Sequence, residues 1–339
     1  MRILLGMSGG VDSAYTAKLL IEKGHSVEGA VLKMHGFTDV SSAQRCADAL
    51  GIPLHVIDCT REFHERVVEN FASEYLSGRT PNPCVICNSE VKLRVLYDFA
   101  IENGFDKIAT GHYARVIKNN ERFCIAPAKD KRKDQSYVLW RLPQEILAYL
   151  TLPLSDVEKT DVQSESRADG LPSADAKESQ EICFIPDNDY AGYIERNFQS
   201  SPEGNFVDVN GKVLGRHKGI IHYTVGQRKG LGISLGKRMF VCKINPDDNT
   251  VVLSDEVKHT TDEIYVDGLV FSGMAPAEDG EVSLTAKFRY LSPRVEVRVK
   301  FLGNGTAKVS AQEGARSVTP GQSAVFYDEN GIAFGGIIC

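Results

Sequence analysis

The segment Ile3-Leu4-Leu5-Gly6-Met7-Ser8-Gly9-Gly10-Val11-Asp12-Ser13 joins a short apolar run to a glycine-rich turn. This order predicts a strand, a tight turn and a helix N-terminus, where backbone N–H groups bind phosphate. The turn lacks the lysine of the G-x-x-x-x-G-K-[ST] loop and is not the G-x-G-x-x-G dinucleotide pattern. A carboxylate beside phosphates needs a divalent cation between them, so we expect Mg²⁺ near Asp12. Two adjacent glycines alone would also fit an ordinary tight turn.

The first 115 or so residues extend this unit into an α/β domain. Short apolar runs alternate with amphipathic stretches, which is typical of βαβ units and a parallel sheet. The expected strands are 3–5, 27–32, 54–57 and 107–109. The expected helices are 13–22, 42–50, 62–75 and 90–102, and a helical region from about 136 to 150 follows the polar loop 129–134.

The chain becomes β-rich beyond about residue 197. Gly, Asn and Asp turns separate short alternating runs there, of which 295–301 is the clearest strand. The runs 206–213 and 240–253 suggest a smaller β unit before it. We therefore expect three domains, 1–196, 197–258 and 259–339.

Composition indicates an ordinary globular protein. The 339 residues are 42% hydrophobic and carry a net charge of −6. No apolar run approaches the roughly 20 residues that span a bilayer, and no signal-peptide pattern opens the sequence. We expect a cytoplasmic protein with reduced thiols. The net charge does not indicate a nucleic-acid-binding protein, although a local basic face is sufficient to contact phosphates.

A second informative segment is Thr80-Pro81-Asn82-Pro83-Cys84-Val85-Ile86-Cys87-Asn88. A helix is expected to begin directly after Cys87, and its N-terminus would stabilise a thiolate there, so Cys87 is a candidate nucleophile. The C-x-x-C pair leaves a redox dithiol, half of a zinc site and iron–sulfur ligands open. Cys183 and the other five cysteines, taken singly, are typical of buried apolar residues.

A third segment, Thr110-Gly111-His112-Tyr113, follows the expected strand 107–109. Residues just past the carboxyl end of a parallel strand face the crevice in which such sheets bind ligands. Gly111 would let the backbone approach a ligand, and His112 would hydrogen-bond a substrate or simply cap the turn.

These segments together resemble the tRNA-specific 2-thiouridylase family of the ATP-pyrophosphatase group. The resemblance covers nearly the whole chain, through residues 6–13, 78–83, 87–88, 109–113, 133–137, 179–185, 222–232, 289–290 and 319–325. It implies an N-terminal parallel-sheet domain like the adenine-nucleotide α-hydrolases, a small β-rich central domain and a C-terminal β-barrel. It also implies ATP-dependent 2-thiolation of the wobble uridine of tRNA.

The resemblance further implies site residues and partners. Cys87 takes the nucleophile position and Cys183 the persulfide position, and we expect Asp12 to be the third catalytic residue. The partners would be the tRNA anticodon loop and a sulfur carrier or cysteine desulfurase, with no DNA and no membrane. ATP would be held by Gly6, Met7, Ser8, Gly9, Gly10, Val11, Asp12, Ser13, Leu32 and Gly111. The tRNA would be contacted by Asn82, Pro83, Cys84, His112, Lys133, Asp134, Gln135, Arg289, Tyr290 and Gln322.

The chemistry implied by the family uses all of these parts. Adenylation of the uridine C2 oxygen makes it a good leaving group. A persulfide on Cys183 then supplies the sulfur to C2, and Cys87 releases that sulfur by forming a disulfide with Cys183. The base has to leave its stack to reach both thiols.

One residue departs from the family pattern. The best-known branch has aspartate where this chain has Cys84, so Cys84, Cys87 and Cys183 would alternatively hold a [4Fe–4S] cluster that delivers the sulfur. Two other hypotheses are a small-molecule ligase of the same ATP group and a non-enzymatic RNA-binding protein.

Overall fold

The N-terminal part of the chain is built on a parallel sheet of five strands in the order β3-β2-β1-β4-β7. The computed structural model describes residues 1–339 except 120, 175–181, 235, 256–259 and 317. The strands are β1 (Arg2–Gly6), β2 (Ser26–Lys33), β3 (Leu54–Asp58), β4 (Lys107–Ala109) and β7 (Leu150–Thr151). The order reverses direction between β1 and β4, and α/β sheets bind ligands at such a switch point.

Both faces of this sheet are covered. Ile3 and Leu5 of β1 pack with α1 (Val11–Glu22) and α2 (Val40–Leu50) in one apolar cluster. Leu4, between them, packs in another cluster with α6 (Leu93–Glu102) on the opposite face. Alternation along a strand sends successive side chains to opposite faces, which explains why the run is apolar throughout.

The remaining helical elements connect and flank the sheet. Among the described residues, two segments are π-helical, with i to i+5 hydrogen bonds, and both are continuous with α-helix. In chain order the elements are α3 (Thr60–Phe63), the π-helix η1 (His64–Val68), α4 (Glu69–Leu76), α5 (Pro83–Ile86), the π-helix η2 (Cys87–Lys92), the 3₁₀ turn η3 (Ser136–Leu139), α7 (Gln144–Tyr149), the 3₁₀ turn η4 (Pro153–Asp156), α8 (Lys159–Ala168), α9 (Tyr190–Asn197) and the 3₁₀ turn η5 (Ile220–His222).

Three β structures complete the fold. A hairpin of β5 (Ala114–Asn119) and β6 (Arg122–Pro127) follows β4. A four-stranded sheet contains β8 (Gly204–Val207), β9 (Val213–His217), β10 (Phe240–Asn245) and β11 (Thr250–Ser254). A closed barrel contains β12 (Thr260–Phe271), β13 (Glu281–Lys287), β14 (Val295–Gly303), β15 (Thr306–Arg316), β16 (Ser323–Tyr327) and β17 (Ile332–Ile338).

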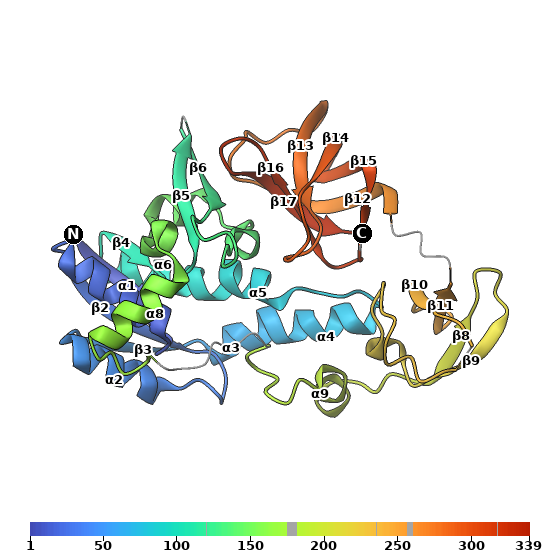
Figure 1. Cartoon of the computed structure of the whole chain (residues 1–339), viewed down its shortest axis with the longest axis horizontal. Helices are drawn as coiled ribbons and strands as arrows, with labels where there is room; N and C mark the ends of the chain where they lie inside the picture. The colour runs from blue at the N-terminus through green and yellow to red at the C-terminus, as the bar shows by residue number, and fades with distance from the viewer. Residues whose placement is uncertain (120, 175–181, 235, 256–259, 317) are drawn as a thin grey trace.

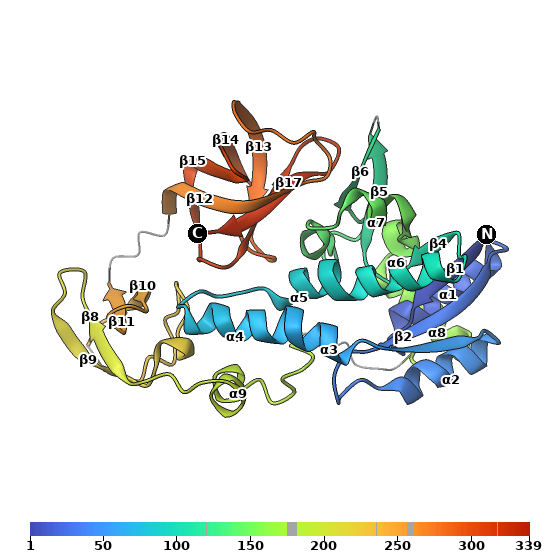
Figure 2. The same cartoon turned by 180° about the vertical axis from the view of Figure 1, so that it is seen from behind.

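α4 runs from the N-terminal parallel sheet toward the four-stranded sheet, and the barrel lies beside it (Figures 1 and 2). At the far end of α4, a Cβ on Gly78 would lie 2.9 Å from Cγ2 of Ile244 in β10. The parallel sheet, the small β-rich part and the C-terminal barrel confirm the expected fold class. No helix in the described part of the chain is long and apolar enough to cross a membrane.

Several expected elements differ in detail. The run 206–213 is not one strand, because a turn at 208–212 separates β8 from β9. The region 136–150 is a 3₁₀ turn and a short helix. The expected break at 196/197 falls at the end of α9, and the one at 258/259 lies outside the described residues. The domain limits therefore stay a prediction.

Candidate active site

The glycine-rich turn after β1 leaves the first N–H groups of α1 available to an anion. Gly10 is the N-cap of α1 and supplies no side-chain cap, while its own N–H donates to Ser8 Oγ over 3.3 Å. Gly9 has φ of +79°, and a Cβ there would lie 2.7 Å from the backbone nitrogen of Ala43 in α2. Only glycine fits this bend, which points the start of α1 toward the carboxyl edge of the sheet.

Asp12, in the first turn of α1, is engaged by two buried side chains. Lys159 Nζ lies 2.6 Å from both carboxylate oxygens, and the Tyr113 hydroxyl donates to Oδ1 over 2.7 Å. Lys159 begins α8 and is 5% exposed, and Tyr113 is 2% exposed. The cation next to Asp12 in this structure is therefore an ammonium, in the place where the sequence suggested Mg²⁺.

The residues after β4 adjoin this loop. A Cβ on Gly111 would lie 3.0 Å from the backbone of Asp12, so the glycine permits close packing on α1. His112 Nδ1 lies 2.8 Å from Thr110 Oγ1. Burial and the nearby charge of Lys92 lower the pKa of His112 to about 3, so the imidazole is neutral at physiological pH. Leu32 is a buried core residue of β2.

The basic loop, defined as residues 129–135, is built around two aspartates. Buried Asp130 accepts hydrogen bonds from the N–H groups of Arg132 and Lys159, at 3.1 and 3.2 Å. Asp134 accepts from the N–H and the hydroxyl of Ser136. The Asp134 carboxylate is thus hydrogen-bonded to the residue that directly follows the loop, and its contact with RNA stays a prediction. The side chains that the loop exposes are Lys129, Lys131 and Arg132.

The two-cysteine motif lies within one long helix, 83–102. Asn82 is its N-cap, accepting from the N–H of Cys84, and Pro83 occupies the first turn. The expected helix start after Cys87 is therefore wrong. Cys87 sits in the second turn, at the start of η2, and is 5% exposed. The helix N-terminus favours negative charge only within its first turn, so Cys84 is better placed for that effect than Cys87.

The charge that favours a thiolate at Cys87 comes from Lys92. Burial raises the pKa of Cys87 to about 12, and the Lys92 ammonium opposes this shift. The thiols of Cys87, Cys84 and Cys183 in turn raise the pKa of Lys92. In η2 the Leu93 N–H bonds to Asn88 O, an i to i+5 step, which places residues five apart, such as Cys87 and Lys92, one π turn apart. The charge of Lys92 therefore acts on the three thiols and on His112.

Cys183 is exposed and is anchored by its buried neighbour Phe184. The Phe184 ring packs edge-on against Phe63 and Phe71, with centroids 5.5 and 5.4 Å apart. Desolvation by the surrounding protein raises the pKa of the Cys183 thiol, and the charge of Lys92 counteracts this shift. Residues 179–181 of the same motif lie outside the described part of the chain.

No group of three or more His, Cys, Asp or Glu side chains in the described residues is arranged to hold a metal ion. As they stand, the thiols of Cys84, Cys87 and Cys183 do not form a ligand set for a cluster.

Three residues expected to contact RNA make contacts within the protein. Gln322 Nε2 donates to the carbonyl oxygens of Thr80 and Pro81, at 2.7 and 3.2 Å. Arg289 donates to Thr319 and to Val225 O. The Tyr290 ring lies 6.0 Å from that of Tyr137. The barrel therefore holds the segment that leads into Asn82.

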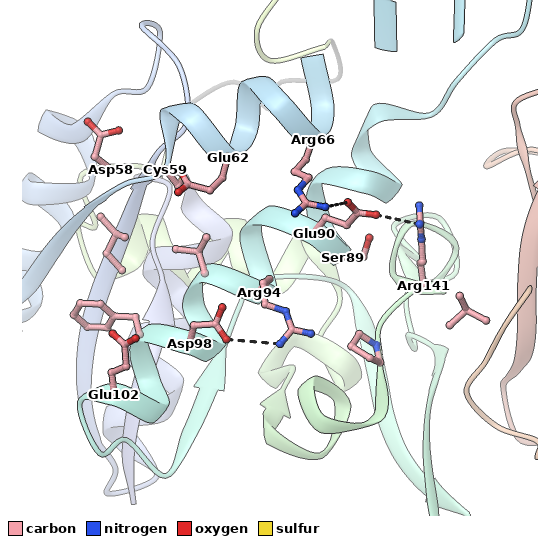
Figure 3. Close-up of a pocket in the computed structure, with 15 residues that line it drawn as sticks. Asp58, Cys59, Glu62, Arg66, Ser89, Glu90, Arg94, Asp98, Glu102 and Arg141 are labelled. Atoms are coloured by element: carbon pink, nitrogen blue, oxygen red, sulfur yellow. Dashed lines mark ion pairs between the residues drawn. The ribbon is translucent and has the colours of Figure 1, made fainter. Parts of the chain in front are cut away.

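A groove of about 760 Å³ lies on another side of helix 83–102 (Figure 3). Glu90 pairs there with Arg141 at 3.0 Å and with Arg66 at 3.7 Å. Buried Cys59, which raises the pKa of Cys87, is also part of its wall. None of the site residues expected from the sequence is among the described residues that line it.

No local sequence pattern singles out Lys92 or Lys159 as site residues. Lys159 lies 147 positions from Asp12, and only the packing of α8 on α1 brings them together. Lys92 follows Cys87 by five positions, a spacing that faces the same side only in a π turn.

Comparisons with known proteins cover nearly the whole chain. Family models match as the tRNA methyl transferase HUP domain over residues 1–187, the tRNA methyl transferase PRC-barrel domain over 191–255 and the aminomethyltransferase beta-barrel domain over 261–338. The tRNA-specific 2-thiouridylase MnmA 2 of Clostridium botulinum strain Hall is 42% identical, over 99% of this chain and 98% of that protein. MnmA of Acetivibrio thermocellus is 40% identical over 99% of both chains.

Likeness to solved structures is lower. A 4-thiouridine synthetase–RNA complex with bound ATP has a TM-score of 0.36 and 18% identity, over 57% of this chain and 50% of that one.

Proposed function

This chain belongs to the tRNA-specific 2-thiouridylase family, and from that membership we propose that it replaces the C2 oxygen of the wobble uridine of tRNA with sulfur, using ATP. The observation that carries the proposal is that Cys87 lies at the edge of the parallel sheet where the nucleotide loop also lies. Its Sγ is 3.9 Å from Sδ of Met34, which directly follows β2, the strand paired with β1. The charge of Lys92 acts on His112, which follows β4 beside the nucleotide loop, and also on Cys87 and Cys183. We therefore propose that the phosphate-binding turn and the two thiols serve one site.

The turn after β1 is suited to ATP. The uncapped N–H groups at the start of α1 would bind phosphate oxygens, and Lys159 supplies a buried cation beside them. Because the Asp12 carboxylate is engaged by Lys159 and Tyr113, we propose that Mg²⁺ enters with the triphosphate. The role of Asp12 is then to hold Lys159 and Tyr113 in place at the first turn of α1.

The thiols carry the sulfur step. The terminal sulfur of a Cys183 persulfide attacks C2 of the adenylated uridine. The Cys87 thiolate attacks Sγ of Cys183, so the S–S bond of the persulfide breaks and a Cys87–Cys183 disulfide forms as AMP leaves. The transferred sulfur is reduced and the two cysteines are oxidised, so a dithiol reductant has to restore them. A sulfur carrier or cysteine desulfurase would reload exposed Cys183.

Lys92 favours the charged form of both thiols in this step. The Cys84 thiol has no part in the persulfide route. We propose the persulfide route because Cys87 and Cys183 take the nucleophile and persulfide positions that the family resemblance implies. Delivery of sulfur from a [4Fe–4S] cluster on Cys84, Cys87 and Cys183 is the alternative, and the test below separates the two.

The test uses the purified chain, unmodified tRNA, ATP and a persulfide donor. The expected products are 2-thiouridine in the tRNA, detected by mass spectrometry, together with AMP and pyrophosphate. Cys87→Ala and Cys183→Ala abolish 2-thiouridine, whereas the matched control Cys84→Ala retains it. Formation of ADP and phosphate, or of AMP without tRNA, would contradict the function. Stoichiometric iron in anaerobically purified protein that is lost in Cys84→Ala would contradict the persulfide route.

A further inference from the structure

The nucleotide loop and the basic loop are joined by two hydrogen-bonded connections. In the first, the Tyr113 hydroxyl donates to Asp12 while its backbone N–H donates to Gln135 Oε1 over 2.9 Å. The Gln135 N–H returns a bond of 2.7 Å to Tyr113 O. In the second, Lys159 binds Asp12 through Nζ and Asp130 through its backbone N–H. Both ends of the basic loop are thereby connected to one carboxylate.

The hairpin β5–β6 explains why these connections are short. Its strands pair Ala114 with Pro127, so the residues just outside it, Tyr113 and Ala128, come together. Tyr113 and Ala128 then pack with Val11 and Tyr15 of α1 and with Val162 of α8, in an apolar cluster separate from the main cores. A displacement of the first turn of α1 is therefore transmitted to the start of the basic loop through buried contacts.

We call the two connections together the bridge, and three of its polar members, Tyr113, Asp130 and Lys159, are shielded from water, whereas Asp12 is partly exposed. Tyr113 and Asp130 are each 2% exposed and Lys159 is 5% exposed. Hydrogen bonds to charged groups in such surroundings are strong and costly to leave unmade. By contrast, Lys129, Lys131 and Arg132 of the same loop are exposed, although Arg132 also pairs with Asp130 over 3.4 Å. The bridge thus has a buried part that meets the nucleotide loop and an exposed basic part suited to RNA phosphates.

We infer that Tyr113 and Asp130 are positioning residues through which a nucleotide bound at the α1 turn orders the basic loop, so that nucleotide and tRNA strengthen each other's binding. This inference rests on the proposed function. A triphosphate that fixes the first turn of α1 also fixes Asp12, and with it the two connections to the loop. The tRNA then meets a loop that has less conformational freedom to lose. Thermodynamic linkage requires the same factor in the reverse direction.

Whether bound triphosphate strengthens or weakens tRNA binding distinguishes coupling through this bridge from simple charge repulsion. A triphosphate close to a polyanion weakens the binding of that polyanion if only Coulomb forces act. An ordered basic loop, by contrast, strengthens the binding of the polyanion. We expect the dissociation constant for unmodified tRNA to fall about fivefold or more when the α,β-methylene analogue of ATP, which cannot be cleaved between these phosphates, saturates the protein.

The experiment compares two tyrosines of the same apolar cluster. Tyr113→Phe removes the hydroxyl that binds Asp12, whereas Tyr15→Phe removes one that donates to Glu165 over 2.7 Å and serves as the matched control. The tRNA dissociation constant is measured by filter binding with and without the analogue. Tyr113→Phe is expected to lose most of the enhancement and Tyr15→Phe to keep it. Asp130→Asn tests the second connection and should also reduce the enhancement.

Three results would overturn the inference. The first is a wild-type tRNA affinity that the analogue leaves unchanged or weakens. The second is an equal loss in Tyr113→Phe and Tyr15→Phe, which would indicate a packing effect. The third is full enhancement in both Tyr113→Phe and Asp130→Asn. A wild-type chain that binds no tRNA at any analogue concentration would instead overturn the proposed function, and the inference with it.

Discussion

Removal of the Lys159 ammonium is the sharpest test of the site, because Lys159 and Asp12 form a nearly buried ion pair at the nucleotide loop. The side chain of Lys159 is 7% exposed and that of Asp12 is 26% exposed. Taking away one partner of a buried pair costs about 3–5 kcal/mol, since the other charge is left uncompensated. Water reaches Asp12, so we expect Lys159→Met to cost about 3 kcal/mol, the lower end of that range.

Urea unfolding is followed by the fluorescence of Trp140, the single tryptophan of the chain. Its side chain is buried, and Nε1 donates to Ser323 Oγ of β16 over 3.0 Å, so the signal reports the N-terminal core and its contact with the barrel. Lys129→Met is the matched control. Lys129 is 58% exposed and 4.0 Å from Glu158, and its loss should change stability by less than about 0.5 kcal/mol.

The double variant Lys159→Met, Asp12→Asn provides the measurement that could refute the Lys159–Asp12 ion pair. If the pair is as described, the double variant is more stable than the sum of the two single effects predicts, by about 2 kcal/mol, because no lone charge remains. Its AMP formation should still be lost, since the loop no longer has its cation. Additivity within about 0.5 kcal/mol would show that the two side chains do not interact as the structure indicates.

Three further outcomes are expected. Because burial raises the pKa of Cys87 to about 12, its alkylation by iodoacetamide should rise about tenfold per pH unit between pH 7 and 9 without a plateau, measured by peptide mass spectrometry; a plateau below pH 9 would contradict this. The folded-state pKa of His112 is depressed to about 3, so the unfolded chain binds the extra proton and stability falls as pH drops from about 6.5 toward 3. His112→Asn should lose less stability over that range, and an equal loss would refute the assignment. Gly321→Ala should release the barrel and shift Trp140 fluorescence, because φ is +88° and the new Cβ would lie 2.9 Å from the Thr80 nitrogen; an unchanged spectrum would argue against the contact.

Four strands of the parallel sheet, β1 to β4, could be predicted from short apolar runs such as Ile3-Leu4-Leu5. The two-residue strand β7 was missed because it lies at the end of the region 136–150, which the sequence pattern indicated as helical. The alternation in 295–301 likewise identified β14, where Val297, Val299 and Phe301 are buried. The start of helix 83–102 was predicted too late in the chain because Pro81 and Pro83 suggested an extended approach. Pro83 in the first turn after an Asn82 cap is in fact a helix start, and the sequence contained that signal.

The site itself was only partly accessible from the sequence. Local motifs located the phosphate turn and the cysteines, because their chemistry depends on residues adjacent in the chain. The partners of those residues come from packing. Lys159 reaches Asp12 from α8, and Gln322 reaches Thr80 from the barrel, over separations that no local pattern records.

The π-helix η2 also fixes the length of the chain in this region. A π turn contains one residue more than an α turn, so it is equivalent to a single insertion in helix 83–102. Deleting one residue there would restore α geometry and rotate everything before it by about 100° relative to everything after it. Leu96 and Ala100 would stay in the core while the cysteines turned away from Cys183. Homologues with an uninterrupted α-helix at this position would therefore need a different arrangement of their sulfur chemistry.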